Sequence, residues 1–148
     1  MQLKTRLDNE IVKIFDPLRD KYVALTPEEY VRQHFVNYLM TELKYPASVM
    51  ANEIGIDLNG TRKRCDTVVF GADMKPLVII EYKAPGVEIS QTVFDQIARY
   101  NMQLQARYLI VSNGIRHYCC RLDYDRDTYN FLPRIPEYSS ISHPFSPN

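Results

Sequence analysis

The chain has 148 residues, of which 45% are hydrophobic and 24% are charged, and its formal net charge is zero. This composition is typical of one globular domain with its own core, and it excludes a disordered chain. The neutral balance argues against a protein that coats nucleic acid by bulk charge, although it permits a localised basic groove. No apolar run reaches the roughly 20 residues that span a bilayer, and the N-terminus has no apolar signal core, so we expect no membrane association.

The first structured segments precede and form a helix. Residues 10–24 hold two short β-like pieces, typical of an edge hairpin or an extended arm. In the segment that follows, Thr26 suits the N-cap, Pro27 the first helical position, and Glu29 completes a capping box. Apolar residues then recur at four-residue steps and predict a buried stripe: Val31, Phe35, Leu39 and Leu43.

Two β-rich runs, residues 67–70 and 77–80, predict neighbouring strands joined by a short loop. If the loop is symmetric about its centre, antiparallel pairing places Phe70 opposite Leu77 and Asp66 opposite Glu81. Directly opposed residues bring like charges within about 5 Å of each other, and Lys83 emerges on the same side as Glu81. Such a cluster is costly at the end of a buried strand unless a cation or a catalytic task compensates it.

The remaining elements complete an α/β pattern. Strands are predicted at 48–58, 108–111, 115–122 and 129–132, a second helix at about 90–105, and tight turns at Asn59–Gly60 and Asn113–Gly114. The second helix carries an apolar stripe with one polar member: Val93, Phe94, Ile97, Asn101 and Leu104. The order predicts a central mixed β-sheet flanked by helices, because the strand after the second helix returns parallel through a right-handed crossover. We expect a single domain at 1–132 and an irregular Pro- and Ser-containing tail at 133–148.

The three cysteines, Cys65, Cys119 and Cys120, make a poor disulfide framework, because an adjacent pair in a strand points to opposite faces. They also lack the paired spacing of a zinc site. Reduced thiols in a cytoplasmic protein are therefore expected. Neither these cysteines nor His34, His117 and His143 show ligand or nucleophile spacing, and we interpret them as structural.

Asp66, followed after fourteen residues by Glu81-Tyr82-Lys83, resembles the motif of the PD-(D/E)XK nuclease superfamily. Gln96-Ile-Ala-Arg-Tyr100 resembles the Gln-x-x-x-Tyr motif found downstream in some branches. The run of PEEYVRQ, RCD, VIIEYKAP, DQIARYN and VSNG is similar to the N-terminal nuclease domain of type I restriction enzyme motor subunits, over about residues 10–122. Cys65 stands where the superfamily name implies proline. The resemblance implies a restriction-endonuclease-like fold.

Asp66 and Glu81 are the predicted metal ligands, because hard carboxylate oxygens suit Mg²⁺ or Mn²⁺. The resemblance adds the carbonyl of Tyr82 as a further ligand. Lys83 is predicted to orient and help deprotonate the attacking water, or to stabilise charge on the phosphate. The alternative is a structural acid pair bridged by Lys83 or Arg64, a role in which a buried ion pair contributes little net stability.

Glu28 is the candidate third acid. It lies about 20° from Phe35 on a helical wheel and so on the apolar face, whereas Glu29 lies well off that face. The superfamily often supplies a helix glutamate to its metal site, which makes Glu28 a candidate catalytic and metal-binding residue. The alternative is a favourable interaction of this carboxylate with the helix N-terminus.

For nucleic acid, the resemblance suggests that Gln96 and Tyr100, one helical turn apart, position DNA or the active-site groups. An ordinary amphipathic helix boundary explains them equally well. Arg32 and Arg64, with Arg62 and Lys63, are candidate phosphate contacts near the site, although each alone is more often a solvated charge.

Together these patterns predict a Mg²⁺- or Mn²⁺-dependent endonuclease-like domain that hydrolyses phosphodiester bonds in DNA. Any function that needs a translocating motor would come from another protein or be absent, and the expected partners are DNA and separate helicase, motor or methyltransferase subunits. The alternative is a non-catalytic DNA-binding or assembly module of a restriction complex that keeps the fold without cleaving.

Overall fold

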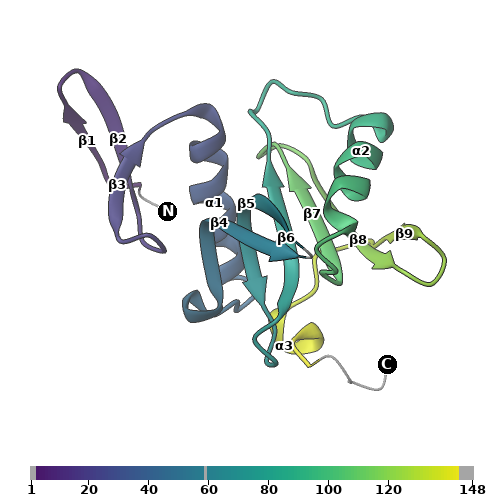
Figure 1. Cartoon of the computed structure of the whole chain (residues 1–148). Coiled ribbons are helices and arrows are strands. Elements are labelled where there is room, and N and C mark those ends of the chain that lie inside the picture. The colour runs from purple at the N-terminus through teal and green to yellow at the C-terminus, as the bar shows by residue number, and fades with distance from the viewer. Residues whose placement is uncertain (1–2, 59, 144–148) are drawn as a thin grey trace.

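A computed structural model describes residues 3–58 and 60–143. Figure 1 shows a central sheet with α1 on one face and α2 on the other, and a smaller sheet beyond α1. The elements in chain order are β1 (Thr5–Asp8), β2 (Ile11–Asp16), β3 (Lys21–Ala24), α1 (Pro27–Thr41), the 3-10 turn η1 (Ala47–Val49), β4 (Met50–Leu58), β5 (Thr61–Phe70), β6 (Pro76–Tyr82), α2 (Gln91–Met102), β7 (Tyr108–Ser112), β8 (His117–Asp123), β9 (Thr128–Phe131) and α3 (Tyr138–Ile141).

The central sheet has six strands in the order β4-β5-β6-β7-β8-β9. β6 and β7 pair in parallel and are joined by α2, whereas the other neighbours are antiparallel. The predicted α/β class with a mixed sheet and helical crossover is therefore confirmed. No helix among the described residues is long and apolar enough to cross a membrane.

Successive side chains of each strand point to opposite faces of the sheet, so the apolar ones form two cores, one on each face. On the first face, Val31 and Phe35 of α1 pack in one cluster with Val78 of β6. On the second face, Phe94 and Ile97 of α2 pack in a separate cluster with side chains of β5, β6 and β7. The predicted helical stripes are confirmed.

The start of α1 follows the capping prediction in part. Oγ1 of Thr26 accepts a hydrogen bond of 3.1 Å from the backbone N–H of Glu29, and Pro27 occupies the first helical turn. The second half of the capping box is wrong, because the Glu29 carboxylate accepts instead from Arg19, Arg32 and Gln33. Cationic partners outcompete a neutral backbone N–H for this carboxylate.

The predicted register of β5 and β6 holds over three pairs, among them Thr67 opposite Ile80 and Val69 opposite Val78. The predicted partner of Phe70 is wrong. A bulge between Val69 and Phe70 places Phe70 opposite Pro76, because an extra residue on one strand shifts the register by one. The error lies at the loop end, so the pairing beside Asp66 is unaffected.

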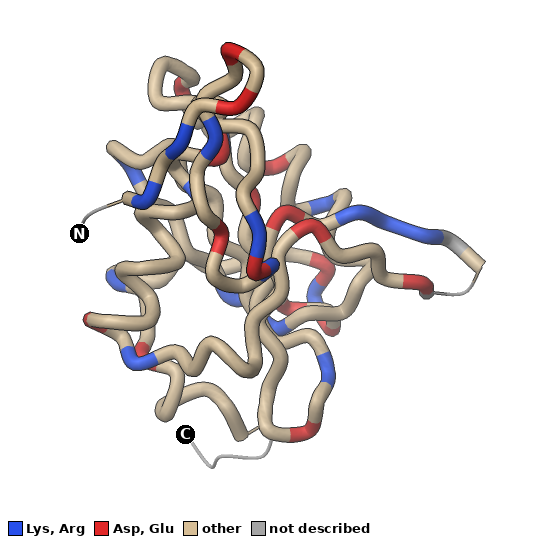
Figure 2. Tube along the Cα trace, turned by 90° about the vertical axis from the view of Figure 1, so that its left-hand side faces the viewer, with Lys and Arg blue, Asp and Glu red and all other residues tan. Residues whose placement is uncertain are grey.

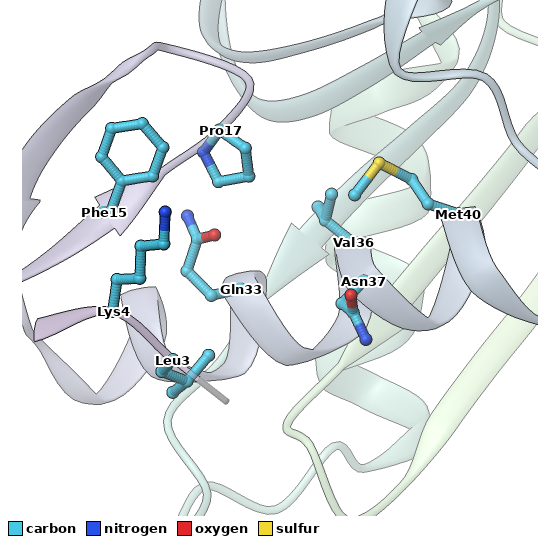
Figure 3. A pocket seen from close by; sticks show the side chains of 8 residues that line it. All are labelled: Leu3, Lys4, Phe15, Pro17, Gln33, Val36, Asn37 and Met40. Carbon is cyan, nitrogen blue, oxygen red and sulfur yellow. The ribbon is translucent and has the colours of Figure 1, made fainter. Parts of the chain in front are cut away.

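The N-terminal segment forms more structure than its sequence predicts. Residues 10–24 contain β2 and β3, and β1 adds a strand before them to give a three-stranded antiparallel sheet. A cavity of about 220 Å³ lies between this sheet and α1, and Figure 3 shows Phe15 and Pro17 on one side with Val36 and Met40 on the other. Lys4 is the single charged residue among the eight that line it, so this cavity has no constellation for catalysis.

The C-terminal segment is less irregular than predicted, because residues 138–141 form α3. The hydroxyl of Tyr138 donates to the carbonyl of Phe70 over 2.9 Å, and the hydroxyl of Tyr45 donates to the carbonyl of Pro136 over 2.8 Å. Ile141 is buried in the α1-side core. The predicted domain boundary at 132 stays a prediction.

The predicted turn residue Asn59 lies outside the described residues, whereas Gly114 has the left-handed φ of +86° that its turn requires.

Candidate active site

The cavity that gathers the predicted site residues lies where α1 begins and where β5 leaves β6. It has a volume of about 590 Å³. Its lining includes both predicted carboxylates, the predicted lysine and further charged residues from neighbouring elements: Asp66, Glu81, Lys83, Arg19, Glu28, Glu29, Arg32 and Glu53, with Tyr82. The predicted convergence of Asp66, Glu81 and Lys83 is thus confirmed as geometry, because side chains of β5, of β6 and of the residue just after β6 line one cavity.

Asp66 and Glu81 lie one residue beyond Thr67 and Ile80, the last pair that joins β5 to β6. Oδ2 of Asp66 accepts a hydrogen bond of 2.9 Å from the backbone N–H of Tyr82. Burial raises the pKa of the Asp66 carboxyl, and the hydrogen bond to Tyr82 offsets only part of that shift. Burial likewise raises the pKa of Glu81, although Lys83 lies 3.2 Å from its Oε2 and lowers it. The two carboxylates therefore lack full compensation for their negative charge.

Arg32 of α1 is buried and holds the cavity wall together. Its Nη1 donates to the backbone carbonyl of Asp66 over 2.5 Å, and its Nη2 donates to Oε1 of Glu53 over 2.7 Å. It also donates to Glu29 on its own helix. Burial lowers the pKa of Arg32, but the hydrogen bond to Glu53 and the nearby charges outweigh it, so the net pKa is raised. These bonds engage the guanidinium within the protein, which argues against the predicted phosphate contact.

Glu53 of β4 lines the cavity, although the sequence patterns give it no role. It has a φ of +55° within a strand, a conformation that is strained for a residue with a side chain. Its carboxylate accepts from Arg32 and, over 2.9 Å, from Nε of Arg64. Burial raises its pKa, but the two arginines outweigh that effect and the net pKa is lowered. A sequence signal exists for this position, because the flanking pairs Asn52–Thr67 and Ile54–Cys65 bring residue 53 beside Asp66.

The positions of Glu28 and Glu29 are the reverse of the prediction. Glu28 is exposed, whereas Glu29 is buried among Arg19, Arg32 and Gln33. Glu28 nevertheless lines the cavity, so the helical wheel predicted the direction of its side chain correctly. The expectation of burial is wrong because the first turn of α1 meets the open hollow rather than packed apolar side chains.

Gln96 and Tyr100 lie on the exposed side of α2, and neither lines the cavity. The ammonium of Lys63 lies 3.3 Å from the ring centroid of Tyr100 and also donates to the Tyr100 carbonyl. This geometry is a cation–π contact that joins β5 to α2. The structure therefore gives Tyr100 a packing partner on β5 and leaves the side chain of Gln96 exposed.

Within residues 3–58 and 60–143, no group of three or more His, Cys, Asp or Glu side chains is arranged to hold a metal ion. The predicted three-acid cage of Asp66, Glu81 and Glu28 is accordingly not formed. Two carboxylates in one hollow still match the donor set of Mg²⁺, which binds through one or two carboxylates and takes its other ligands from water and phosphate. The chemistry of the lining fits a divalent ion that binds together with a phosphate substrate.

Comparisons with known proteins agree with this description. The model of the family "Type I restriction enzyme R protein N terminus (HSDR_N)" matches residues 27–136. The solved fragment of a putative HsdR subunit of a type I restriction enzyme from Vibrio vulnificus YJ016 matches with a TM-score of 0.55 and 18% identity, over 79% of this chain. This likeness shows the fold, and the chain spans 24% of that fragment. A search of curated proteins found no match.

Proposed function

The chain belongs to the family of type I restriction enzyme R protein N termini, and on this premise we propose that it is a metal-dependent nuclease domain that hydrolyses phosphodiester bonds in DNA. The observation that carries the proposal is the meeting of Asp66, Glu81 and Lys83 in one open cavity. The order of these residues along the chain resembles that of the PD-(D/E)XK nucleases. The raised pKa of each carboxyl supports a site in which binding of a cation is favourable, because the cation compensates the buried negative charge.

In the proposed site, Asp66, Glu81 and the carbonyl of Tyr82 would hold Mg²⁺ or Mn²⁺, with Glu28 at the rim of the same cavity. When bound, the ion would supply Lewis-acid polarisation of the scissile phosphate and a bound water of lowered pKa. Lys83, 3.2 Å from Glu81, orients the attacking water and places a positive charge beside the phosphate. The backbone N–H of Tyr82 and the guanidinium of Arg32 fix Asp66 in position.

Arg64 is the proposed phosphate contact closest to the site, because its exposed side chain reaches Glu53 at the cavity wall. Gln96 and Tyr100 on α2 would contact DNA farther from the cavity, since they do not line it. Partners of the whole enzyme, such as a separate helicase or methyltransferase subunit, fit the family but are likewise proposals.

The test is a plasmid-nicking assay with Mg²⁺ and with Mn²⁺ on the purified chain. Glu81→Gln and Lys83→Ala should each abolish nicking while thermal melting shows a folded protein. Lys75→Gln is the matched control, because Lys75 is exposed in the loop at the opposite end of β5. Full activity of either site variant would remove the mechanism. Stabilisation by Mg²⁺ without cleavage of any DNA form would favour the non-catalytic binding or assembly module instead.

A further inference from the structure

The outer half of β5 belongs to a two-stranded arm. β5 pairs with β6 only from Thr67 onward, whereas residues 61–65 pair with β4 alone. Figure 2 shows this arm standing out from the body, with an unbroken stretch of Lys and Arg along one strand. That stretch is Arg62, Lys63 and Arg64.

One face of the arm is anchored on α2. Lys63 is buried, lies over the ring of Tyr100 and donates to its backbone carbonyl. Cys65 is buried in the α2-side core, and Ile54 and Ile56 of β4 pack against that core. An isolated two-stranded ribbon is marginal in water, so this contact with a helix is what holds the arm in a fixed direction.

The opposite face carries two exposed arginines beside the cavity. The side chains of Arg62 and Arg64 are 70% and 73% exposed, and their partners are Asp57 at 3.4 Å and Glu53 at 2.9 Å. Glu53 also lines the candidate active site, so this face continues directly into the cavity wall. Ion pairs of exposed arginines contribute little net stability, which makes both arginines available to a stronger anionic partner.

Gly55 opens the surface between these two arginines. It lies opposite Arg64 in the ribbon, and a Cβ added to it would lie 2.6 Å from Nε of Arg62. The missing side chain thus lets the Arg62 guanidinium lie against β4, over the residue that pairs with Arg64.

We infer that this arm, through Arg62 and Arg64, binds in the major groove of duplex DNA beside the scissile phosphate. The inference rests on the proposed function and names the form of its substrate. A two-stranded ribbon fits the major groove of B-form DNA, which is about 12 Å wide, but not the deep and narrow major groove of A-form RNA. On binding, each guanidinium exchanges its carboxylate for phosphate oxygens, which arginine holds in a bidentate manner.

The test measures binding in EDTA, where cleavage does not interfere, to a fluorescent 30-base-pair DNA duplex, its single strand and an RNA duplex of the same sequence. Wild type is compared with Arg62→Gln/Arg64→Gln over a series of salt concentrations. The matched control is Lys75→Gln/Arg126→Gln, which removes two exposed positive charges away from the arm. Thermal melting checks that each variant is folded.

We expect wild type to bind the DNA duplex more tightly than either other probe. The arm variant should weaken duplex binding and reduce the slope of log K against log salt by about 2, because two phosphates are no longer neutralised. The control variant should leave that slope unchanged. An arm variant that behaves like the control overturns the inference, as does equal binding of DNA and RNA duplexes.

Cleavage in Mg²⁺, measured on the same proteins at saturating DNA, separates this inference from the proposed function. If Glu81→Gln loses cleavage while the arm variant binds like the control, the nuclease proposal stands and the arm inference fails. If wild type binds the duplex through the arm but never cleaves, the arm inference stands and the nuclease proposal fails.

Discussion

The guanidinium of Arg32 donates a hydrogen bond of 2.5 Å to the backbone carbonyl of Asp66, which ties the first helix to the strand that carries the candidate catalytic acid. The same side chain reaches Glu53 on the neighbouring strand. Three elements, α1, β4 and β5, therefore share one buried cation. The placement of Asp66 depends on this link as much as on the pairing of β5 with β6.

Replacing Arg32 by methionine should lower the free energy of unfolding by about 3–5 kcal/mol, because it leaves the carboxylates of Glu29 and Glu53 without their shared cation. Arg32→Lys should recover part of that stability but less of the cleavage rate, since one ammonium cannot reach all three partners. Urea denaturation and kcat measured in parallel would check this. Equal recovery of both quantities would show that the role of Arg32 is merely structural.

Asp66→Asn should stabilise the metal-free protein at neutral pH. A carboxyl with a raised folded-state pKa binds its proton more tightly when folded, so its contribution is most favourable below the unfolded pKa of about 4 and is lost as pH rises through the folded pKa. The variant keeps an oxygen for the Tyr82 N–H and removes the penalty. The variant should melt at a higher temperature than wild type, by a margin that grows from pH 4 to pH 8. Added Mg²⁺ should make wild type the more stable of the two. A variant that is less stable at pH 8 would contradict the prediction.

Acid should weaken the ion pairs that Asp16 and Glu53 form with their arginine partners. The pKa of Asp16 and that of Glu53 are lowered, because their bonds to Arg19, Asn52, Arg32 and Arg64 outweigh burial. Their stabilisation is present above the unfolded pKa of about 4 and is lost as pH falls through the folded values. Glu53→Gln should therefore destabilise the protein at pH 7 and have less effect at pH 3. An effect of equal size at both pH values would exclude an ionic origin.

Gly55→Ala should raise the free energy of unfolding by about 0.5–1 kcal/mol, because glycine in a strand interior carries an entropic cost. The backbone of Gly55 is not in the left-handed region, and the new methyl group meets only the flexible end of Arg62. Chemical denaturation tests the prediction. A loss of stability would mean that the Arg62 guanidinium cannot move aside.

Local sequence patterns predicted the central sheet and the meeting of Asp66, Glu81 and Lys83, because a short symmetric loop fixes register and alternation fixes the face. The same reasoning failed one residue from the loop, at Phe70, where a bulge intervened. Bulges depend on packing around the turn, which a strand pattern does not encode.

The exchange of Glu28 and Glu29 has a different cause. A helical wheel gives the direction of a side chain but not what it meets there. Glu29 is buried because Arg19 and Arg32 supply charge on that side, and Arg19 comes from the connection between β2 and β3. A long-range partner of this kind is invisible to periodicity, as was the first strand of the N-terminal sheet.

The docking of the C-terminal segment decides where the chain can be shortened. The Tyr45 hydroxyl donates to the carbonyl of Pro136, and the carbonyl of Phe70 accepts from the Tyr138 hydroxyl. Ile141 is buried in the α1-side core. A version trimmed after residue 132 would expose the part of the α1-side core that Ile141 covers. It would also remove the hydrogen-bond partner of the buried Tyr45 hydroxyl. Truncated forms made for crystallisation or for fusion to another protein should therefore extend through at least residue 142.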